Sequence, residues 1–345
     1  NKNYVSPKFD LASSNAPIYP LSKIAIDPSI DLHPLKVTQK LIEKLSNIYQ
    51  VPKDHIAITS GCTGAITLMS CIYSDILVET PGYEPMKLTP ESFSCNVTTF
   101  QRPWTESNSF DLSILSIESS ITNNTQAVWI TNPHNPSGGY VTKEKIKEIA
   151  TFLKTKNIIL FIDEVYLDLL FPLGENPSVH LSDNIVITSS LTKTYGFSST
   201  RIGWLIGPKK VITQANLILT HLNGLPSGPG MAITFTALDQ LDKLKENTLK
   251  ELKEKNIFAK EVFSTLDSIR WSPGEIKIIG MLDINKVLTK NNLSDTQWTE
   301  KLIQNTGIVV APGSFFGCSG KMRIGLGAQN SIVTEGLTLL RDFLK

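Results

Sequence analysis

Residues 126–166 read QAVWITNPHNPSGGYVTKEKIKEIATFLKTKNIILFIDEVY, and this stretch decides the fold. Two short runs in it, Gln126–Thr131 and Asn157–Ile162, are rich in Ile and Val and apolar on both faces. Between them an amphipathic run from Thr142 to Lys156 begins with a residue suited to cap a helix. Strands that are apolar on both faces and alternate with helices are typical of a parallel sheet covered by helices.

The same alternation extends to both sides of this stretch. Further strands are predicted at His55–Thr59, Asp75–Glu79, Asn96–Phe100, Asn184–Thr188 and Ile202–Ile206, and a long helical pattern covers Met231–Leu266. After Trp271 the pattern changes to strand-like Glu275–Ile284, a helix capped near Ser294, strand-like Ile308–Val310 and Met322–Leu326, and a final helix from Ser331.

We therefore predict an α/β protein with a large domain and a smaller α+β domain. The large domain, residues 30–245, contains a mostly parallel seven-stranded sheet between helices and binds the ligand. The small domain combines residues 246–345 with an N-terminal arm, residues 1–29. A length of 345 residues agrees with two cores, because single cores seldom grow much beyond ~250–300 residues.

Composition excludes several classes of protein. The net charge of +1 gives no electrostatic reason to expect a nucleic-acid or membrane partner. No apolar run approaches the ~20 residues of a membrane helix, and Asn1–Asp10 has no signal-peptide core. The 4 cysteines are scattered, which predicts neither a disulfide framework nor a metal site. We expect a cytoplasmic protein.

Polar residues follow the predicted strands, at the edge of such a sheet where ligands bind. Thr59-Ser-Gly-Cys-Thr-Gly-Ala65 joins the first strand to a helix, so its free backbone N–H groups could hold an anion, although a simple helix cap explains it equally well. Tyr83 follows the second strand, where a packing role is the plain alternative. Asn132–Gly139 contains two Asn-Pro turns that would hold amide side chains over the sheet edge.

An acid and a lysine complete the set. Asp163 ends a buried strand, where a carboxylate requires a cationic partner such as a protonated pyridine nitrogen. Lys193 follows the sixth strand in Ser189-Ser-Leu-Thr-Lys193, and Arg201 comes eight residues later. Alone, Lys193 reads as a surface lysine. Together with an acid, an aromatic ring, an amide and an anion-binding turn at neighbouring strand ends, Lys193 is better interpreted as a lysine that binds a cofactor.

The runs NPHNPSG, DEVYLDL, SLTKTYGFSSTRIGW and APGSFFG…MRIGLG together resemble fold-type-I pyridoxal-phosphate (PLP) aminotransferases of the class I/II superfamily. The resemblance covers nearly the whole chain, and the short arm and overall length are closest to the histidinol-phosphate-aminotransferase-like branch.

The resemblance implies a role for each matching residue. Lys193 would carry PLP as a Schiff base and then move the proton between Cα and C4′, and Asp163 would keep the ring nitrogen protonated. Asn135 and Tyr166 would hydrogen-bond the phenolic oxygen, and Tyr83 would stack on the ring. The phosphate would be bound by Gly61, Cys62, Thr63, Ser190 and Arg201, and the substrate carboxylate by Arg323, with Asn15 and Asn135 beside it.

The resemblance also implies a homodimer with shared active sites. His33-Pro34 stands where histidinol-phosphate-aminotransferase-like members have Tyr-Pro, whose tyrosine reaches the partner's cofactor phosphate. Our hypothesis is that His33 substitutes for it, and a turn histidine without a role is the alternative. The arm segment Leu11–Pro17 resembles the part of the family that closes over the substrate.

The expected reaction moves an amino group between an amino acid and a 2-oxo acid through pyridoxamine phosphate, with 2-oxoglutarate and glutamate as one pair. Ala311-Pro-Gly-Ser314 lacks the arginine that helps histidinol-phosphate aminotransferases bind their substrate's phosphate, which weakens that alternative. A PLP decarboxylase or lyase on the same scaffold, and a non-catalytic PLP-binding module, remain further alternatives. The side-chain specificity is not readable from the sequence.

Overall fold

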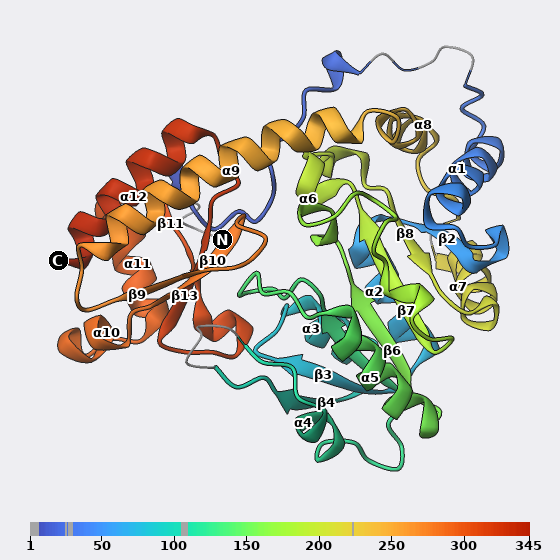
Figure 1. Ribbon diagram of the computed structural model, residues 1–345, viewed down its shortest axis with the longest axis horizontal. Coiled ribbons are helices and arrows are strands. Elements are labelled where there is room, and N and C mark those ends of the chain that lie inside the picture. The colour runs from blue at the N-terminus through green and yellow to red at the C-terminus, as the bar shows by residue number, and fades with distance from the viewer. Residues whose placement is uncertain (1–6, 25, 27–29, 105–109, 223) are drawn as a thin grey trace.

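The computed structural model describes residues 7–24, 26, 30–104, 110–222 and 224–345. Figure 1 shows two parts, a large one built on a wide sheet and a smaller one that contains the C-terminus. The predicted boundary between residues 245 and 246 falls inside helix α9 (Leu241–Ser264), which runs from the large part along the small one. Residues 1–6, 25 and 27–29 of the predicted arm lie outside the described residues. The domain bounds stay a prediction.

The large sheet has seven strands in the order β2-β8-β7-β6-β5-β3-β4. Only β8 runs antiparallel to its neighbours, so the sheet is mostly parallel and the predicted fold class is confirmed. The strands are β2 (Ile56–Thr59), β3 (Asp75–Thr80), β4 (Asn96–Gln101), β5 (Ala127–Thr131), β6 (Ile159–Asp163), β7 (Ile185–Ser190) and β8 (Gly203–Ile206).

Successive side chains of these strands enter two separate hydrophobic cores, one on each face of the sheet. Val128 and Ile130 of β5 pack on one face, and Ala127 and Trp129 pack on the other. The first face is covered by α1 (Pro34–Tyr49), α5 (Lys143–Thr155) and α8 (Gly228–Ala237), and the second by α2 (Gly61–Ile72), α3 (Pro85–Ser92) and α7 (Lys209–Leu222). Burial on both faces explains the continuous apolar runs in the sequence.

Two predictions for the large part were wrong in detail. The Asn96–Phe100 run is not apolar on both faces, because β4 is an edge strand with several exposed side chains. The Met231–Leu266 pattern is two helices, α8 and α9, separated by a turn at residues 238–240. Two further helices are short. They are α4 (Ile114–Glu118), between β4 and β5, and α6 (Thr192–Tyr195), which follows β7.

The small part is a four-stranded antiparallel sheet, β12-β13-β10-β9, packed against helices. Its strands are β9 (Arg270–Pro273), β10 (Ile279–Asp283), β12 (Ala311–Pro312) and β13 (Lys321–Gly325), and its helices are α10 (Asn285–Asn291), α11 (Asp295–Thr306) and α12 (Asn330–Leu344). Ser294 caps α11 as predicted, through a capping box with Gln297. The strand predicted over Glu275–Ile284 begins only at Ile279.

The N-terminal segment fastens the two parts together. Its strand β1 (Phe9–Asp10) pairs in parallel with β11 (Ile308–Val309) of the small part. Farther along, the Ala16 N–H donates to the carbonyl of Lys193 at 2.8 Å, and the Tyr19 N–H donates to the carbonyl of Gly196 at 3.0 Å. The segment therefore contacts the carboxyl edge of the large sheet and the small part at once.

Gly203 on β8 allows a close contact with the start of α2 at this edge. A Cβ on Gly203 would lie 2.7 Å from the carbonyl carbon of Gly61, the first residue of α2. We predict that Gly203→Ala displaces the start of α2 and lowers the free energy of unfolding by about 1–3 kcal/mol, as overpacking does in buried sites. Urea denaturation measures this. The control is Gly64→Ala, whose Cβ would lie no closer than 3.3 Å to a neighbour; equal stability of both variants would contradict the prediction.

Candidate active site

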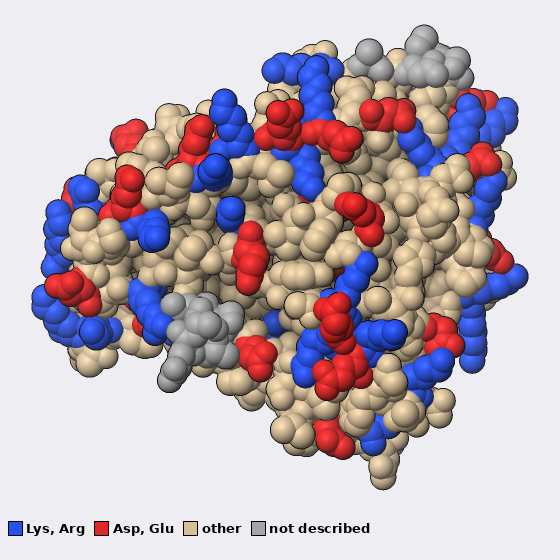
Figure 2. Space-filling model, in the orientation of Figure 1, with Lys and Arg blue, Asp and Glu red and all other residues tan. Residues whose placement is uncertain are grey.

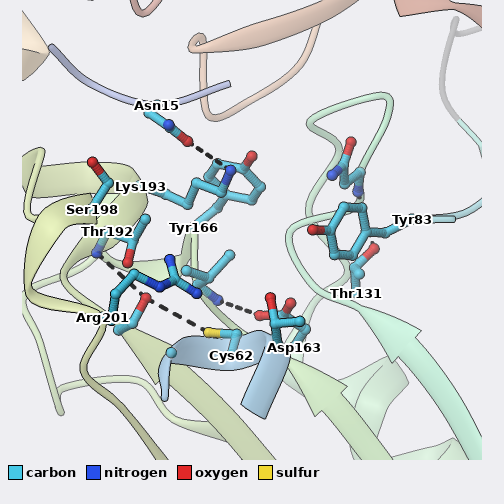
Figure 3. Close-up of a pocket in the computed structure, with 15 residues that line it drawn as sticks. Asn15, Cys62, Tyr83, Thr131, Asp163, Tyr166, Thr192, Lys193, Ser198 and Arg201 are labelled. Carbon is cyan, nitrogen blue, oxygen red and sulfur yellow. Dashed lines mark hydrogen bonds between the residues drawn. The ribbon is translucent and has the colours of Figure 1, made fainter. Parts of the chain in front are cut away.

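A pocket of about 190 Å³ opens at the carboxyl edge of the large sheet, where β5, β6 and β7 end and α2 begins. It is lined by most of the predicted site residues: Asn15, Gly61, Cys62, Thr63, Tyr83, Asn135, Asp163, Tyr166, Ser190, Lys193 and Arg201. In Figure 3, Lys193 and Tyr83 face the pocket from opposite sides, and Asp163, Cys62 and Arg201 lie beneath them. Residues separated by up to 186 positions in the chain, from Asn15 to Arg201, thus meet at one place.

The first turn of α2 and Arg201 form a cradle suited to an anion. Gly61 has φ +71°, and a Cβ there would lie 3.1 Å from Nη2 of Arg201, so this close approach requires glycine. Arg201 Nη2 also donates to the carbonyl of Ser60 at 3.5 Å. The Cys62 thiol lies 3.7 Å from the Ser190 hydroxyl. Backbone N–H groups at a helix start, a hydroxyl and a guanidinium together are donors for a phosphate.

Lys193 lies on α6 with its amine turned into the pocket. Its Nζ donates to Asn15 Oδ1 at 2.6 Å and to Ser14 Oγ at 3.1 Å. Burial, and then the positive charge of Arg323, lower the pKa of Lys193 to about 8. A substantial fraction of this amine is therefore neutral near physiological pH, as a base or nucleophile requires.

Asp163 is the last residue of β6 and is buried. One of its carboxylate oxygens accepts the N–H of Val165 at 3.0 Å. Burial raises the pKa of Asp163 to about 6, although the Val165 N–H and the charge of Lys193 act in the opposite direction. A carboxylate that burial destabilises in this way would gain from a cationic group bound beside it.

Tyr83 and Tyr166 border the pocket from two loops. The hydroxyl of Tyr166 donates to the carbonyl of Ser14 at 3.2 Å. Burial raises the pKa of each phenol to about 12, so both stay neutral donors at physiological pH.

Arg323, on β13 of the small part, does not line the pocket itself but contacts Asn135, which does. Its Nη1 donates to Asn135 Oδ1 at 2.9 Å, and its Nη2 donates to the carbonyl of Ala12 at 2.7 Å. The Arg323 guanidinium lies 4.8 Å from the centre of the Phe316 ring. Its Nε is buried without a hydrogen-bond partner among the residues that the structure describes. Because Asn135 Oδ1 accepts from Arg323, the amide nitrogen is the end of Asn135 that can donate to a ligand.

His33 does not line this pocket in the single chain. It is exposed at the start of α1, and its N–H donates to Asp31 Oδ1 at 2.9 Å. The hypothesis that it serves a partner subunit stays a prediction.

Five residues of the site were missed from the sequence: Ser14, Thr131, Val165, Thr192 and Ser198. Thr131 ends β5 and directly precedes the Asn-Pro turns, so the rule that ligands bind at strand ends could have found it. Ser14 has no such signal, because its contact with Lys193 spans 179 positions.

A sheet edge that presents a lysine, an acid and an anion cradle has the groups that a fold-type-I PLP enzyme requires. The model of the family "Aminotransferase class I and II" matches residues 23–337, and the chain belongs to that family. It is a PLP-dependent aminotransferase.

Individual relatives agree with this assignment. The chain is similar to an aspartate aminotransferase of Sulfurisphaera tokodaii, with 24% identity over 90% of this chain and 80% of the relative. It is also similar to a histidinol-phosphate aminotransferase of Listeria innocua, with 24% identity over 72% of this chain and 71% of the relative. A PLP-dependent aminotransferase from Streptococcus suis has the same fold, with a TM-score of 0.87, 19% identity and coverage of 98% and 94% of the two chains.

The pocket fits this cofactor. The cradle at Gly61 and Arg201 would supply donors for a phosphate, and Asp163 would supply a carboxylate for a protonated ring nitrogen. Lys193 Nζ is the amine available in the same pocket.

The raised pKa of Asp163 yields a prediction for the cofactor-free protein. A group whose pKa is raised by folding contributes stability below its ordinary pKa of 3.8 and loses it as the pH rises through about 6. At pH 8, Asp163→Asn therefore stabilises the cofactor-free protein, by up to about 3 kcal/mol, and the gain fades toward pH 4. Urea denaturation at both pH values measures it.

Added PLP should reverse this order, because only the wild-type carboxylate can pair with the ring nitrogen. Asp111→Asn, at an exposed position, is the control and should alter neither measurement. A cofactor-free Asp163→Asn protein that is less stable than wild type at pH 8 would contradict the electrostatic account of the pocket.

Proposed function

We propose that this chain transfers an amino group between an amino acid and a 2-oxo acid, with glutamate and 2-oxoglutarate as one pair, and that Lys193 moves the proton. The observation that carries the proposal is the position of the Lys193 amine in one pocket with Asp163 and the Arg201 cradle, where partial burial and Arg323 lower its pKa to about 8. Family membership supports the reaction class.

The proposed roles at the cofactor follow from the donors and acceptors in the pocket. When bound, PLP supplies a cationic ring that withdraws electrons from the substrate Cα. Asp163 would hold the proton on the ring nitrogen, and Tyr83 would cover the ring face. Gly61, Cys62 and Thr63 would bind the phosphate through backbone N–H groups, together with Ser190 and Arg201. Asn135 and Tyr166 would donate hydrogen bonds to the phenolic oxygen.

Lys193 would act on the substrate as a general base. Its neutral Nζ would accept the Cα proton, since burial and Arg323 keep the amine from being fully protonated. Asn15 and Ser14 contact the same nitrogen, so they orient it toward the pocket.

Arg323 would bind the substrate carboxylate, with Asn15 and Asn135 beside it. Its guanidinium is already oriented by Asn135 and Ala12, so little further ordering is needed on binding. The position that would carry a phosphate-binding arginine in histidinol-phosphate aminotransferases is Ala311, which pairs with Arg323 in the small sheet. An apolar residue there supports an amino acid rather than histidinol phosphate.

We also propose that the protein is a homodimer in which each active site contains residues of both subunits. We propose further that it is cytoplasmic. Leu32 and Leu35 flank His33 with 48% and 55% of their surface exposed, as expected of residues that a second copy would cover.

Among the described residues, no helix is long and apolar enough to cross a membrane. Figure 2 shows Lys and Arg interspersed with Asp and Glu on the visible face, which offers no basic patch for a nucleic acid.

The half-reaction tests the proposed chemistry. An amino acid alone should remove the visible absorbance of the lysine-bound cofactor, and a 2-oxo acid should restore it. Lys193→Ala should lower the rate on the order of 100- to 10,000-fold, because the general base is lost. Lys154→Ala, at an exposed position on α5, is the control.

Other outcomes would identify the alternatives. Release of CO₂ or pyruvate without transfer of the amino group would indicate a decarboxylase or lyase. Full transaminase activity in the Lys193→Ala protein would overturn the assignment of Lys193.

The role of His33 is tested separately. His33→Ala should weaken PLP binding about tenfold, as expected for the loss of one hydrogen bond to a charged group, and leave the dimer intact in sedimentation experiments. His221→Ala, at the exposed end of α7, is the control.

Mixed dimers reveal which subunit His33 serves. A dimer of one His33→Ala and one Lys193→Ala chain should retain one site with wild-type PLP affinity, because that site takes its lysine and its histidine from different chains. Unchanged PLP affinity in the His33→Ala homodimer would refute the hypothesis.

A further inference from the structure

Two charged side chains, Glu79 and Arg102, are buried behind the active site without lining its pocket. Glu79 lies near the end of β3, and Arg102 directly follows β4. Arg102 Nη1 lies 2.6 Å from Glu79 Oε2, and the two side chains are 1% and 0% exposed. A buried ion pair is often no more stabilising than apolar residues of the same volume. Stability alone therefore gives this pair no clear advantage, which directs attention to what it contacts.

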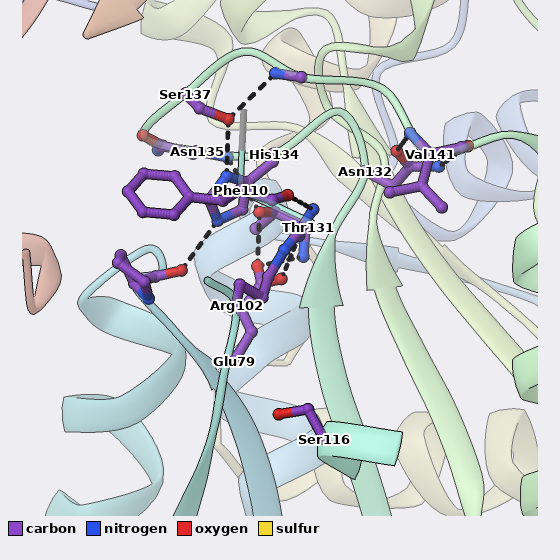
Figure 4. Close-up of polar contacts among 12 residues, drawn as sticks. Glu79, Arg102, Phe110, Ser116, Thr131, Asn132, His134, Asn135, Ser137 and Val141 are labelled. Atoms are coloured by element: carbon purple, nitrogen blue, oxygen red, sulfur yellow. Dashed lines mark hydrogen bonds and ion pairs between the residues drawn. The ribbon is translucent and has the colours of Figure 1, made fainter. Parts of the chain in front are cut away.

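The second oxygen of Glu79 binds Thr131 twice. Glu79 Oε1 accepts the Thr131 N–H at 2.7 Å and the Thr131 hydroxyl at 2.7 Å. Since a carboxylate only accepts, the hydroxyl proton of Thr131 must point to Glu79. The Thr131 oxygen is then an acceptor toward its other partner, the Asn135 N–H, at 3.0 Å. One carboxylate thus sets the direction of both bonds (Figure 4).

Arg102 supports the same loop from its other side. Its Nη2 donates to the carbonyl of Phe110 at 2.9 Å, and the Phe110 ring meets His134 edge-on with centres 5.5 Å apart. Burial, and then the charge of Arg102, hold the pKa of His134 well below its usual range, so this ring is neutral.

The hydrogen bonds of His134 then follow. Its Nε2 must carry the proton, because its partner at 2.8 Å is the carbonyl of Pro81. Nδ1 therefore accepts the hydroxyl of Ser137 at 2.8 Å. The loop from Asn132 to Gly139 is thus held by Thr131, which directly precedes it, and by its own His134 and Ser137.

The chain of contacts ends at the substrate side of the pocket. Asn135 Oδ1 accepts from Arg323 Nη1 at 2.9 Å, so the loop that Glu79 and Arg102 hold also holds the guanidinium. We propose that Glu79 and Arg102 are positioning residues for amino-group transfer, which orient Asn135 and, through it, Arg323. The inference rests on the proposed role of Arg323 in binding the substrate carboxylate.

The decisive variant replaces the pair by apolar residues of similar size, Glu79→Leu with Arg102→Met. The double variant leaves no buried charge unpaired, but Thr131 loses its acceptor and the Phe110 carbonyl loses its donor, so some loss of stability is expected under either role. A merely structural pair predicts that recognition of a carboxylate is unchanged in the folded variant, whereas a positioning pair predicts a misplaced Arg323. The double variant therefore distinguishes a structural role from a positioning role.

Arg323 is probed with two reagents that combine with bound PLP whatever the side-chain specificity of the enzyme. Aminooxyacetate carries a carboxylate, and O-methylhydroxylamine does not. The ratio of their rate constants measures carboxylate recognition. We expect the double variant to lower this ratio about ten- to a hundredfold, because small displacements of a positioning group have effects of this size. A wild-type ratio in a stable double variant would overturn the inference.

Two controls separate this inference from the proposed function. Arg323→Ala must lower the ratio; if it does not, the proposed role of Arg323 is wrong. Lys145→Met with Glu148→Leu removes an exposed ion pair of α5 and should leave the ratio unchanged.

If the double variant does not fold, Thr131→Val decides, because it removes the hydroxyl and keeps the ion pair. It should lower the ratio, and Thr131→Ser should recover most of the loss. Equal ratios in wild type and Thr131→Val would overturn the inference.

Discussion

Lys193 and Asp163 are an amine and a carboxylic acid that have been removed from water into the same pocket, and burial disfavours the charged form of each. Each charge partly compensates the other, yet the pKa of the acid remains raised and that of the amine lowered. The surrounding fold brings these two groups together. The parallel strands β6 and β7, which are buried over nearly all of their length, deliver both groups to one edge. A cationic ring that binds against Asp163 would therefore stabilise the charged form of this carboxylate.

The site is built from loops, but these loops are not free to move independently. Asn135 is held by Thr131 and by Arg323, and the loop around it is fixed at His134 and Ser137. Many of these contacts have only one possible direction, because a carboxylate or a carbonyl can only accept. Such unidirectional hydrogen bonds fix a side chain more firmly than their individual strengths suggest, since the opposite orientation would bury an unsatisfied donor.

Much of the fold and the pocket could be predicted from the sequence, because both depend on local patterns. Strands buried on both faces appear as apolar runs, and the residues that follow them meet at one edge. What the sequence could not supply depends on packing. Ile276 donates to the carbonyl of Gly138, so the start of the predicted strand Glu275–Ile284 packs on the Asn-Pro loop instead of extending β10.

Two other features had no local signal either. The turn at residues 238–240 contains neither Gly nor Pro, so the break between α8 and α9 was not visible. The pair Glu79–Arg102 depends on β3 and β4 lying side by side in register. Neither charged residue alone indicates a role in the sequence. Their contact in the fold is what supports a positioning role.

The segment around Ser14 has a thermodynamic consequence. Within four residues it offers the Ala12 carbonyl to Arg323 and the side chains of Ser14 and Asn15 to Lys193. The charge of Arg323 also lowers the pKa of Lys193. A carboxylate bound at Arg323 would offset that charge and make the amine more basic, and by reciprocity a protonated amine would favour the bound anion. Occupancy of one group and protonation of the other are therefore linked equilibria, and substitutions in this short segment cannot tune either one alone.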